Sequence, residues 1–237
     1  LSKLSLNKNF QINDFSKIKI KTFNDKFNNN DFLIDKSKEI KILGKIFDSE
    51  PLLKSLLSKN DKNIFSKSFK SKSKINFKEV LTGTNDNVSN FSMIASIDKG
   101  TYENLSLKGR FSSNEIIEMT IYPTMEGKKV LQVVSDRARP FIKNFNFIEG
   151  FEGGKLEYES TITKTGSDSL LLLTDFKVSK VPALAKLLSL ASLQGIADTL
   201  SGEGIRFDSF EMKTNSQGNV MNIEDALAMG PAVSILL

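Results

Sequence analysis

The chain contains no cysteine, no histidine and no tryptophan among its 237 residues. Without cysteine it can form neither a disulfide framework nor a thiolate metal site. Without histidine it lacks the side chain most used as a general base near neutral pH, and this excludes Ser-His-Asp triads and ordinary zinc sites. An enzyme would have to use carboxylates, lysine or tyrosine, and no such constellation stands out. The sequence therefore predicts a protein that is not an enzyme and that binds no metal or other cofactor.

Long apolar runs are also missing, because no segment reaches the ~20 apolar residues that span a bilayer as a helix. The nearest candidate, 182–200, contains Lys186, Gln194 and Asp198. The chain begins at Leu1 without an initiator methionine or a signal peptide, and it stops in mid-pattern. We interpret it as a fragment of a longer protein whose membrane anchor lies outside it.

Charge is unevenly distributed although the net charge is only +5. Residues 1–80 hold 18 lysines against 9 acidic residues, whereas the rest of the chain holds 15 basic against 19 acidic residues. Nucleic-acid binding is one interpretation of a basic half. However, the lysines are scattered among Asn, Asp and Ser, the first arginine is Arg110, and no recognition motif is present. Lysines on solvated strand faces, or lysines near anionic headgroups, are the alternatives, and we expect no nucleic-acid partner.

Alternating apolar and polar residues recur along the chain and predict strands with one buried and one wet face. This pattern is typical of antiparallel sheets. The segment 169–176, "SLLLLTDF", lacks the alternation and is interpreted as a more enclosed strand. The apolar members of the clearest alternating segments are Leu105, Leu107 and Phe111; Leu156, Tyr158 and Ile162; and Met221, Ile223, Leu227 and Met229.

Clusters of Gly, Asn and Asp separate these segments and supply the positive φ angles that tight hairpins need. Together the two signals predict about twelve strands. Their approximate ranges are 9–21, 31–47, 73–82, 88–98, 101–111, 115–122, 128–135, 154–164, 168–179, 204–214, 218–229 and 231–237.

Two or three short helices are expected between the strands, at 48–59, 136–146 and 182–200. The third is apolar nearly all round, so it must be covered widely by protein or lipid. We predict that it caps the end of a groove formed by the sheet, although simple packing in a core is the alternative. Its capping side chains are Leu184, Leu187, Leu188, Leu193, Ile196 and Leu200.

The C-terminal region resembles AsmA-like proteins, the group that includes YhdP and TamB. The resemblance rests on a Gly-Gly-x-Leu strand at 153–156, the helix entry "FKVSKVPALAKLLSLAS" at 176–192, "GEGIRF" at 202–207, and a closing hairpin with "AMGPA". It covers about 145–237, is fainter over 128–146, and extends to 1–100 only in general strand style.

This resemblance implies a mainly β protein: a long twisted antiparallel sheet curled into an open hydrophobic groove, forming one continuous domain over 1–237. It also implies a periplasmic protein, anchored in the inner membrane of a diderm bacterium by a segment outside this chain. Such proteins are implicated in moving phospholipid to the outer membrane, and hence in outer membrane biogenesis.

On this interpretation acyl chains lie along the apolar strand face while headgroups stay in water, since each CH₂ removed from water gains ~0.8 kcal/mol. Three alternatives remain: a closed β-sandwich core, an envelope scaffold that pairs through exposed sheet edges, and an enzyme using the carboxylates of Glu157 and Glu159. The predicted groove-lining residues are Leu105, Leu107, Phe111, Leu156, Tyr158, Ile162, Phe207, Met221 and Ile223.

Overall fold

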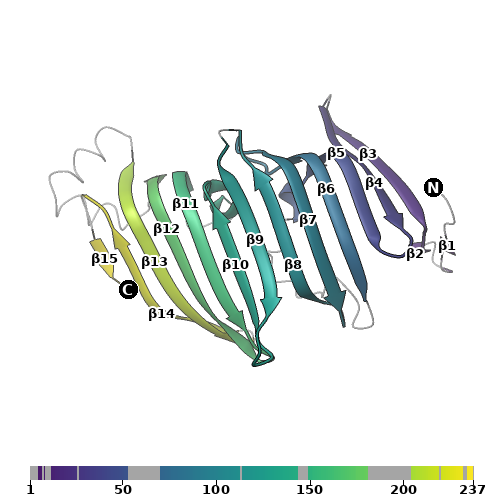
Figure 1. Ribbon diagram of the computed structural model, residues 1–237. Coiled ribbons are helices and arrows are strands. Elements are labelled where there is room, and N and C mark those ends of the chain that lie inside the picture. The colour runs from purple at the N-terminus through teal and green to yellow at the C-terminus, as the bar shows by residue number, and fades with distance from the viewer. Residues whose placement is uncertain are drawn as a thin grey trace. The chain divides into compact units, whose positions relative to one another are not determined.

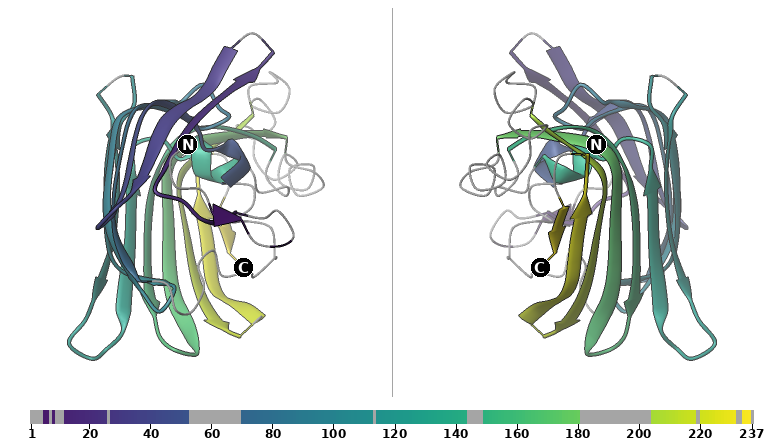
Figure 2. Two further views of the ribbon diagram at one scale, coloured as in Figure 1. Left: turned by 90° about the vertical axis from the view of Figure 1, so that its right-hand side faces the viewer. Right: turned by 90° about the vertical axis from the view of Figure 1, so that its left-hand side faces the viewer.

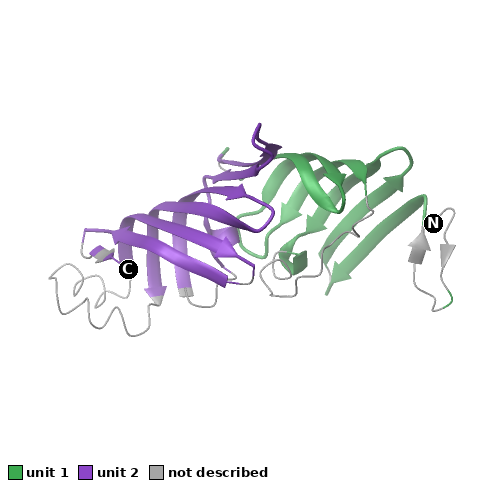
Figure 3. Ribbon diagram, turned by 90° about the horizontal axis from the view of Figure 1, so that it is seen from below, with its two compact units in different colours: residues 1–114 green, residues 115–237 purple. Residues whose placement is uncertain are grey.

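The computed structural model describes residues 5–6, 8, 12–25, 27–52, 70–112, 114–143, 149–180, 204–218, 220–231 and 234–236. The chain divides into two compact units (Figure 3), which we call unit 1, Leu1–Asn114, and unit 2, Glu115–Leu237. Each unit is built on an open β-sheet, so the prediction of a mainly β protein is confirmed. The single continuous domain predicted for 1–237 stays a prediction.

Unit 1 contains a sheet in which six strands lie side by side in chain order (Figure 1). A separate short pair, β1 (Ser5–Leu6) and β2 (Ile12–Asp14), is antiparallel. The six strands are β3 (Lys17–Asn24), β4 (Phe27–Lys36), β5 (Ile40–Asp48), β6 (Ser71–Leu81), β7 (Val88–Asp98) and β8 (Thr101–Arg110).

The prediction of a wholly antiparallel sheet is wrong at one place, because β5 and β6 pair in parallel. Parallel neighbours need a crossover of a dozen or more residues, and the long connection after Asp48 supplies that length. The predicted strand 31–47 is also two antiparallel strands, β4 and β5. The polar run Asp35 to Glu39 marks the turn at Ser37 to Glu39, and the predicted range overlooked it.

Unit 2 contains a sheet of seven strands, again in chain order and antiparallel throughout. The short helix α2 (Arg139–Ile142) precedes the third of them. The strands are β9 (Ile116–Pro123), β10 (Lys129–Ser135), β11 (Glu149–Ile162), β12 (Gly166–Lys180), β13 (Ile205–Gln217), β14 (Val220–Met229) and β15 (Ser234–Leu236).

The helices are shorter than predicted where they are described. Within 136–146, α2 forms a single turn with Pro140 at its start, which suits the first turn because proline has no N–H to donate. Within 48–59, residues Glu50 to Leu52 are helical. The predicted helix 182–200 and its six capping leucine and isoleucine residues lie outside the described residues.

The strands of unit 2 bend at the ends nearest α2 (Figure 2). On β11 the bend coincides with positive φ angles at Gly153 (71°) and Gly154 (80°), and on β12 with Asp175 (55°). These residues are neighbours across the sheet, because Gly153 pairs with Phe176. The aligned kinks bring the strand ends over α2.

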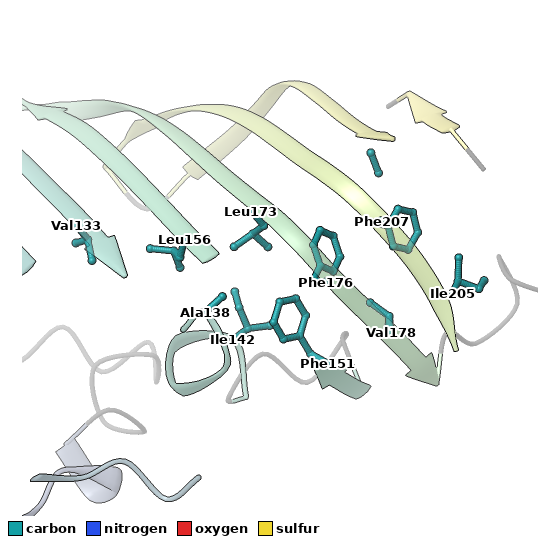
Figure 4. Close-up of a cluster of buried hydrophobic side chains, with 11 residues drawn as sticks. Val133, Ala138, Ile142, Phe151, Leu156, Leu173, Phe176, Val178, Ile205 and Phe207 are labelled. Carbon is teal, nitrogen blue, oxygen red and sulfur yellow. The ribbon is translucent and has the colours of Figure 1, made fainter. Parts of the chain in front are cut away.

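Side chains from five strands and the α2 region form the hydrophobic core of unit 2 (Figure 4). Ala138 and Ile142 of α2 are 0% and 3% exposed, and the backbone N–H of Ala138 donates to the carbonyl of Gly154 at 2.8 Å. Each large apolar side chain buried in this way contributes about 1.5–3 kcal/mol. The core therefore lies on one face of the sheet, under the kinked strand ends.

Candidate functional site

The cross-strand register of unit 2 defines one face, which we call its inner face. In antiparallel pairing, directly opposite residues lie on the same side of the sheet. Starting from Leu156, the pairs Leu156–Leu173, Leu173–Phe210 and Phe210–Ala228 cross four strands on one side. The other inner-face residues are Leu131, Val133, Tyr158, Ser160, Ile162, Ser167, Ser169, Leu171, Met212, Thr214, Ser216, Met221, Ile223 and Ala226.

The large apolar side chains of this inner face are buried near α2 and exposed at the far end of β14, whereas smaller residues between them, such as Ser160 and Thr214, stay buried. Leu173 and Leu156 are 2% and 5% exposed. One step further, Tyr158 and Leu171 are half-buried and pack against the edge of the core. At the far end Ile223 is 55% exposed. The face thus stays apolar beyond the point where the described protein covers it.

The covered end is closed by stacked aromatic rings. Phe176 stacks on Phe151 with ring centroids 5.2 Å apart and 18° between planes, and on Phe207 at 5.2 Å and 16°. All three rings are buried. Phe151 reaches Phe176 because Gly154 lies beneath it: a Cβ there would stand 3.0 Å from Cζ of Phe151. The stack seals the α2 end of the inner face.

A row of hydroxyl groups crosses the inner face between its covered and open ends. The hydroxyl of Tyr158 donates to Oγ of Ser169 at 3.1 Å, and that of Ser169 donates to Oγ of Ser160 at 2.9 Å. Ser160 and Thr214, on either side of Ser169, are 2% and 7% exposed. Because these hydroxyls bond one another, they can lie beside hydrocarbon at little desolvation cost.

Unit 1 has an inner face of the same kind. Pairing places Ile18, Ile34, Ile42, Ile75 and Met93 side by side across five strands, and all five are half-buried. The next inner-face positions are more covered. They include Phe77 (6% exposed), Ala95 (3%), Ile97 (4%) and Leu105 (7%).

The nine predicted lining residues fall on the inner faces, although their exposure differs widely. In unit 1, Leu105 and Leu107 pair with Ala95 and Met93, and Phe111 is 3% exposed. In unit 2, the register and the hydrophobic core place the remaining six on one face. Their exposures are 5% for Leu156 and 7% for Phe207, intermediate for Tyr158 and Ile162, 55% for Ile223 and 62% for Met221.

Two details of the predicted alternation are wrong. The register of β13 and β14 shifts between Lys213 and Thr214, so Leu227 and Met229 both lie on the face opposite Met221 instead of beside it. Ala226 takes the inner position and is 3% exposed. A bulge of one residue reverses the face of everything beyond it, and the period of two cannot reveal that.

The segment 169–176 is not an enclosed strand. Leu171 and Leu173 are on the inner face, whereas Leu170 is 40% exposed on the opposite, outer face, between Glu159 and Lys213. Glu157 and Glu159 are exposed on that outer face too, and Glu159 accepts a hydrogen bond from the amide of Gln132 at 2.8 Å. These carboxylates are hydrated surface groups, in agreement with the one-sided interpretation.

Electrostatic perturbations are small and lie away from the inner face of unit 2. Burial raises the pKa of Tyr102 above its usual value. In the β9–β10 turn, a hydrogen bond and the charge of Lys128 lower the pKa of Glu126, and Glu126 raises that of Lys128; the two groups are 2.9 Å apart. Within the described ranges, no group of three or more potential metal ligands comes together.

Sequence reasoning missed several residues that build the covered end, namely Val133, Phe151, Leu173 and Phe176, whereas α2 lies within the predicted helix 136–146. One partial signal was available. Asp175, with positive φ, directly precedes the inner-face Phe176, and Asn90 precedes Phe91 in the same way on β7. Asn and Asp tolerate the left-handed region better than other non-glycine residues, so an Asx-Phe step permits a kink; Asp31-Phe32 and Asn76-Phe77 also lie within strands but have no positive φ, so the dipeptide alone does not identify a kink.

Comparison with known proteins identifies no relative, since no family model, curated protein or solved structure matches this chain. The AsmA-like interpretation therefore stays a prediction based on sequence motifs. In the part of the chain that is described, no helix is long and apolar enough to cross a membrane.

Proposed function

We propose that the inner faces bind hydrocarbon and that this protein holds phospholipid acyl chains along them. One observation carries the proposal: the inner face of unit 2 stays apolar where covering protein ends, with Ile223 and Met221 more than half exposed. An acyl chain lying on this surface would be removed from water along its length, which is worth ~0.8 kcal/mol per CH₂.

The chemistry of the face suits a lipid tail rather than a polar ligand. Hydrocarbon contact is non-directional, so a track of Leu, Ile, Met and Phe needs no recognition motif. The hydroxyl groups of Ser160, Ser169 and Tyr158 are hydrogen-bonded to one another. The central hydroxyl, that of Ser169, therefore needs no hydrogen bond from a ligand. The lipid headgroup would stay at the open margin, in water.

The cellular role is the second part of the proposal and rests on the sequence resemblance. We infer that the chain belongs to a periplasm-spanning AsmA-like protein, anchored in the inner membrane of a diderm bacterium by a segment outside this sequence. In that role it would carry phospholipid from the inner to the outer membrane without chemical conversion, and so contribute to outer membrane biogenesis.

Adjacent residues of β14 provide a matched test. Met221 (62% exposed) and Ile223 (55%) lie on the inner face, whereas Val220 (60%) and Met229 (47%) lie on the outer face. The protein and the double variants Met221→Asp/Ile223→Asp and Val220→Asp/Met229→Asp are purified from bacteria, and their lipids are quantified by mass spectrometry. We expect co-purifying phospholipid with the protein and the outer variant, and about tenfold less with the inner variant, because a carboxylate against hydrocarbon is strongly unfavourable.

Equal lipid recovery from the two variants, or no lipid with the protein, would count against an acyl-binding face. A protein partner without lipid would instead favour the envelope scaffold. The outermost strand described in unit 1, β3, argues against pairing through that edge, because it carries Lys17, Lys19 and Lys21. Lysines on an edge strand oppose the addition of another strand.

A further inference from the structure

The outer face of unit 1, opposite its apolar inner face, is unusually basic. Its residues are identified by the cross-strand register, which runs through all six strands in two complete rows. One row is Lys17, Asp35, Lys41, Lys74, Ile94 and Ser106, and the other is Lys19, Leu33, Leu43, Asn76, Ser92 and Lys108.

Cations far outnumber carboxylates on this outer face. Strand positions that alternate with the buried residues add more lysines on the same side, and the acidic strand residues among them include Asp31, Asp35 and Asp98. The Nζ of Lys17 lies 3.2 Å from Asp35. The cationic residues are Lys17, Lys19, Lys21, Lys41, Lys45, Lys72, Lys74, Lys78, Lys108 and Arg110, all exposed.

The arrangement places like charges against each other. Lys41 of β5 is directly opposite Lys74 of β6, and like charges in this position destabilise a sheet, although Nζ of Lys41 also lies 3.1 Å from the carboxylate of Glu39. The outer face of unit 2 mixes both signs, as where Lys213 lies 3.2 Å from Glu211. A polyanionic surface would add favourable charge contacts to the lysines that outnumber the carboxylates in unit 1.

Exposed apolar side chains stand among these lysines. Leu43 and Ile94 are 52% and 57% exposed near the middle of the outer face. At the tip of the β3–β4 hairpin (Figure 1), Phe23 is 59% exposed, and Nζ of Lys21 lies 5.3 Å from its ring centroid, on the same side of the strand. Cations mixed with exposed apolar groups are typical of surfaces that rest in the headgroup region of a membrane.

A nucleic acid fits this face less well. Base readout depends on arginine, amide or carboxylate groups aimed at base edges, and single-strand binding depends on aromatic platforms. The face carries one arginine, Arg110, and Phe23 lies at the hairpin tip rather than among the central lysines. An array of lysines spread over a sheet face suits a surface that carries many phosphates.

We propose that the outer face of unit 1 docks onto the surface of a bilayer that contains anionic phospholipid. The lysines contact headgroup phosphates, and Phe23, Leu43 and Ile94 enter the interfacial layer. This surface is separate from the inner faces, so peripheral membrane binding and acyl-chain binding can succeed or fail independently.

The test measures sedimentation of the full chain with vesicles of phosphatidylcholine alone and with about 30 mol% phosphatidylglycerol. We expect binding only to the anionic vesicles, and marked weakening between about 0.1 M and about 0.5 M salt, where the screening length shortens. Lys45→Glu/Lys74→Glu/Lys78→Glu should weaken binding by about 100-fold or more, because each lysine near an anionic surface contributes roughly one factor of five to ten.

The matched control is Lys155→Glu/Lys164→Glu/Lys213→Glu in unit 2, which changes the net charge of +5 by the same amount. It should bind within about twofold of the unchanged protein, since it leaves the unit 1 face intact. Phe23→Ser should weaken binding several-fold without moving the urea unfolding midpoint, because Phe23 is exposed.

Three results would overturn the proposal: no preference for anionic vesicles, equal losses in the two triple variants, or complete displacement of vesicles by duplex DNA at equal phosphate concentration. The last result would make a nucleic acid the better partner. The urea unfolding midpoints of both triple variants are the folding control. If they equal the midpoint of the unchanged protein, a loss of vesicle binding is not caused by unfolding.

Discussion

The two units bend their sheets around the same arrangement of residues. In unit 1 the central ring is Phe77, and the residue directly opposite it on β5 is Gly44. In unit 2 the central ring is Phe176, and the residue directly opposite it on β11 is Gly153. In unit 1 a Cβ on Gly44 would collide with Phe32 and Phe77, whereas in unit 2 the missing side chain of the next residue, Gly154, leaves room for Phe151 beside Phe176.

The flanking rings are arranged alike in part. Phe47 stacks on Phe77 at 5.1 Å and 19° in unit 1, much as Phe151 stacks on Phe176 in unit 2. Unit 1 adds an edge-to-face contact, with the ring of Phe32 5.6 Å from that of Phe77 and at 88° to it. Both geometries are favourable for aromatic pairs.

The difference in strand direction shows what the arrangement requires. The stacked pair of unit 1 bridges the parallel strands β5 and β6, whereas that of unit 2 bridges the antiparallel strands β11 and β12. Side chains alternate between faces in either direction. The arrangement therefore depends on which face a phenylalanine occupies and on a glycine across from it, not on how the strands run.

The largest expected effect is removal of a central ring. Phe77→Ala and Phe176→Ala should each cost about 3–5 kcal/mol of unfolding free energy, because both rings are buried. Hydrogen exchange read by mass spectrometry should lose protection in β5–β7 for the first variant and in β11–β13 for the second. Phe27→Ala, at a 79% exposed site, should change stability by less than about 0.5 kcal/mol. Equal loss of protection in both units from one variant would show that they do not unfold separately.

Filling the glycine positions should have the next largest effect and should separate two causes. At Gly44 an added Cβ would lie 2.5 Å from Cβ of Phe32, so Gly44→Ala should cost about 1–3 kcal/mol through crowding. Gly154→Ala combines a 3.0 Å contact with a φ of 80°. Gly127, with φ 73° and open space around it, isolates the backbone cost at about 1–2 kcal/mol. The free energies of unfolding are measured in urea. If Gly127→Ala loses the most stability of the three variants, crowding is not the reason for glycine at Gly44 and Gly154.

The smallest effect concerns the kinks themselves. Asn90 (φ 52°) and Asp175 (φ 55°) each precede an inner-face phenylalanine. Replacing either by alanine should destabilise its unit by about 1 kcal/mol, whereas glycine should be nearly neutral, since it adopts positive φ without strain. The free energy of unfolding of the alanine and glycine variants is measured by urea denaturation, provided that the dependence of this free energy on urea concentration is the same as in the unchanged protein. An alanine variant as stable as the glycine variant would mean that the positive φ stores no strain.

Much of the fold was predictable from the sequence. Every strand after residue 70 lies within or close to a predicted range. One-sided burial imposes a period of two, and the order of apolar and polar residues shows that period directly. The predicted lining residues fall on the inner faces for the same reason. The parallel pairing of β5 with β6 and the face reversal after Ile223 were not predictable, since neither changes the local pattern of apolar residues. The turn at 37–39 was marked by the polar run 35–39 and was overlooked.

The sequence by itself determined that the strands are one-sided and that the chain cannot use cysteine or histidine chemistry. Only the tertiary structure decided where protein covers the apolar face and where it leaves it open. The reason is physical: alternation states which side of a strand avoids water, but not what covers that side. Leu156 and Met221 have the same predicted role, and their 5% and 62% exposure follows from distance to α2 and the aromatic stack, which only long-range packing fixes.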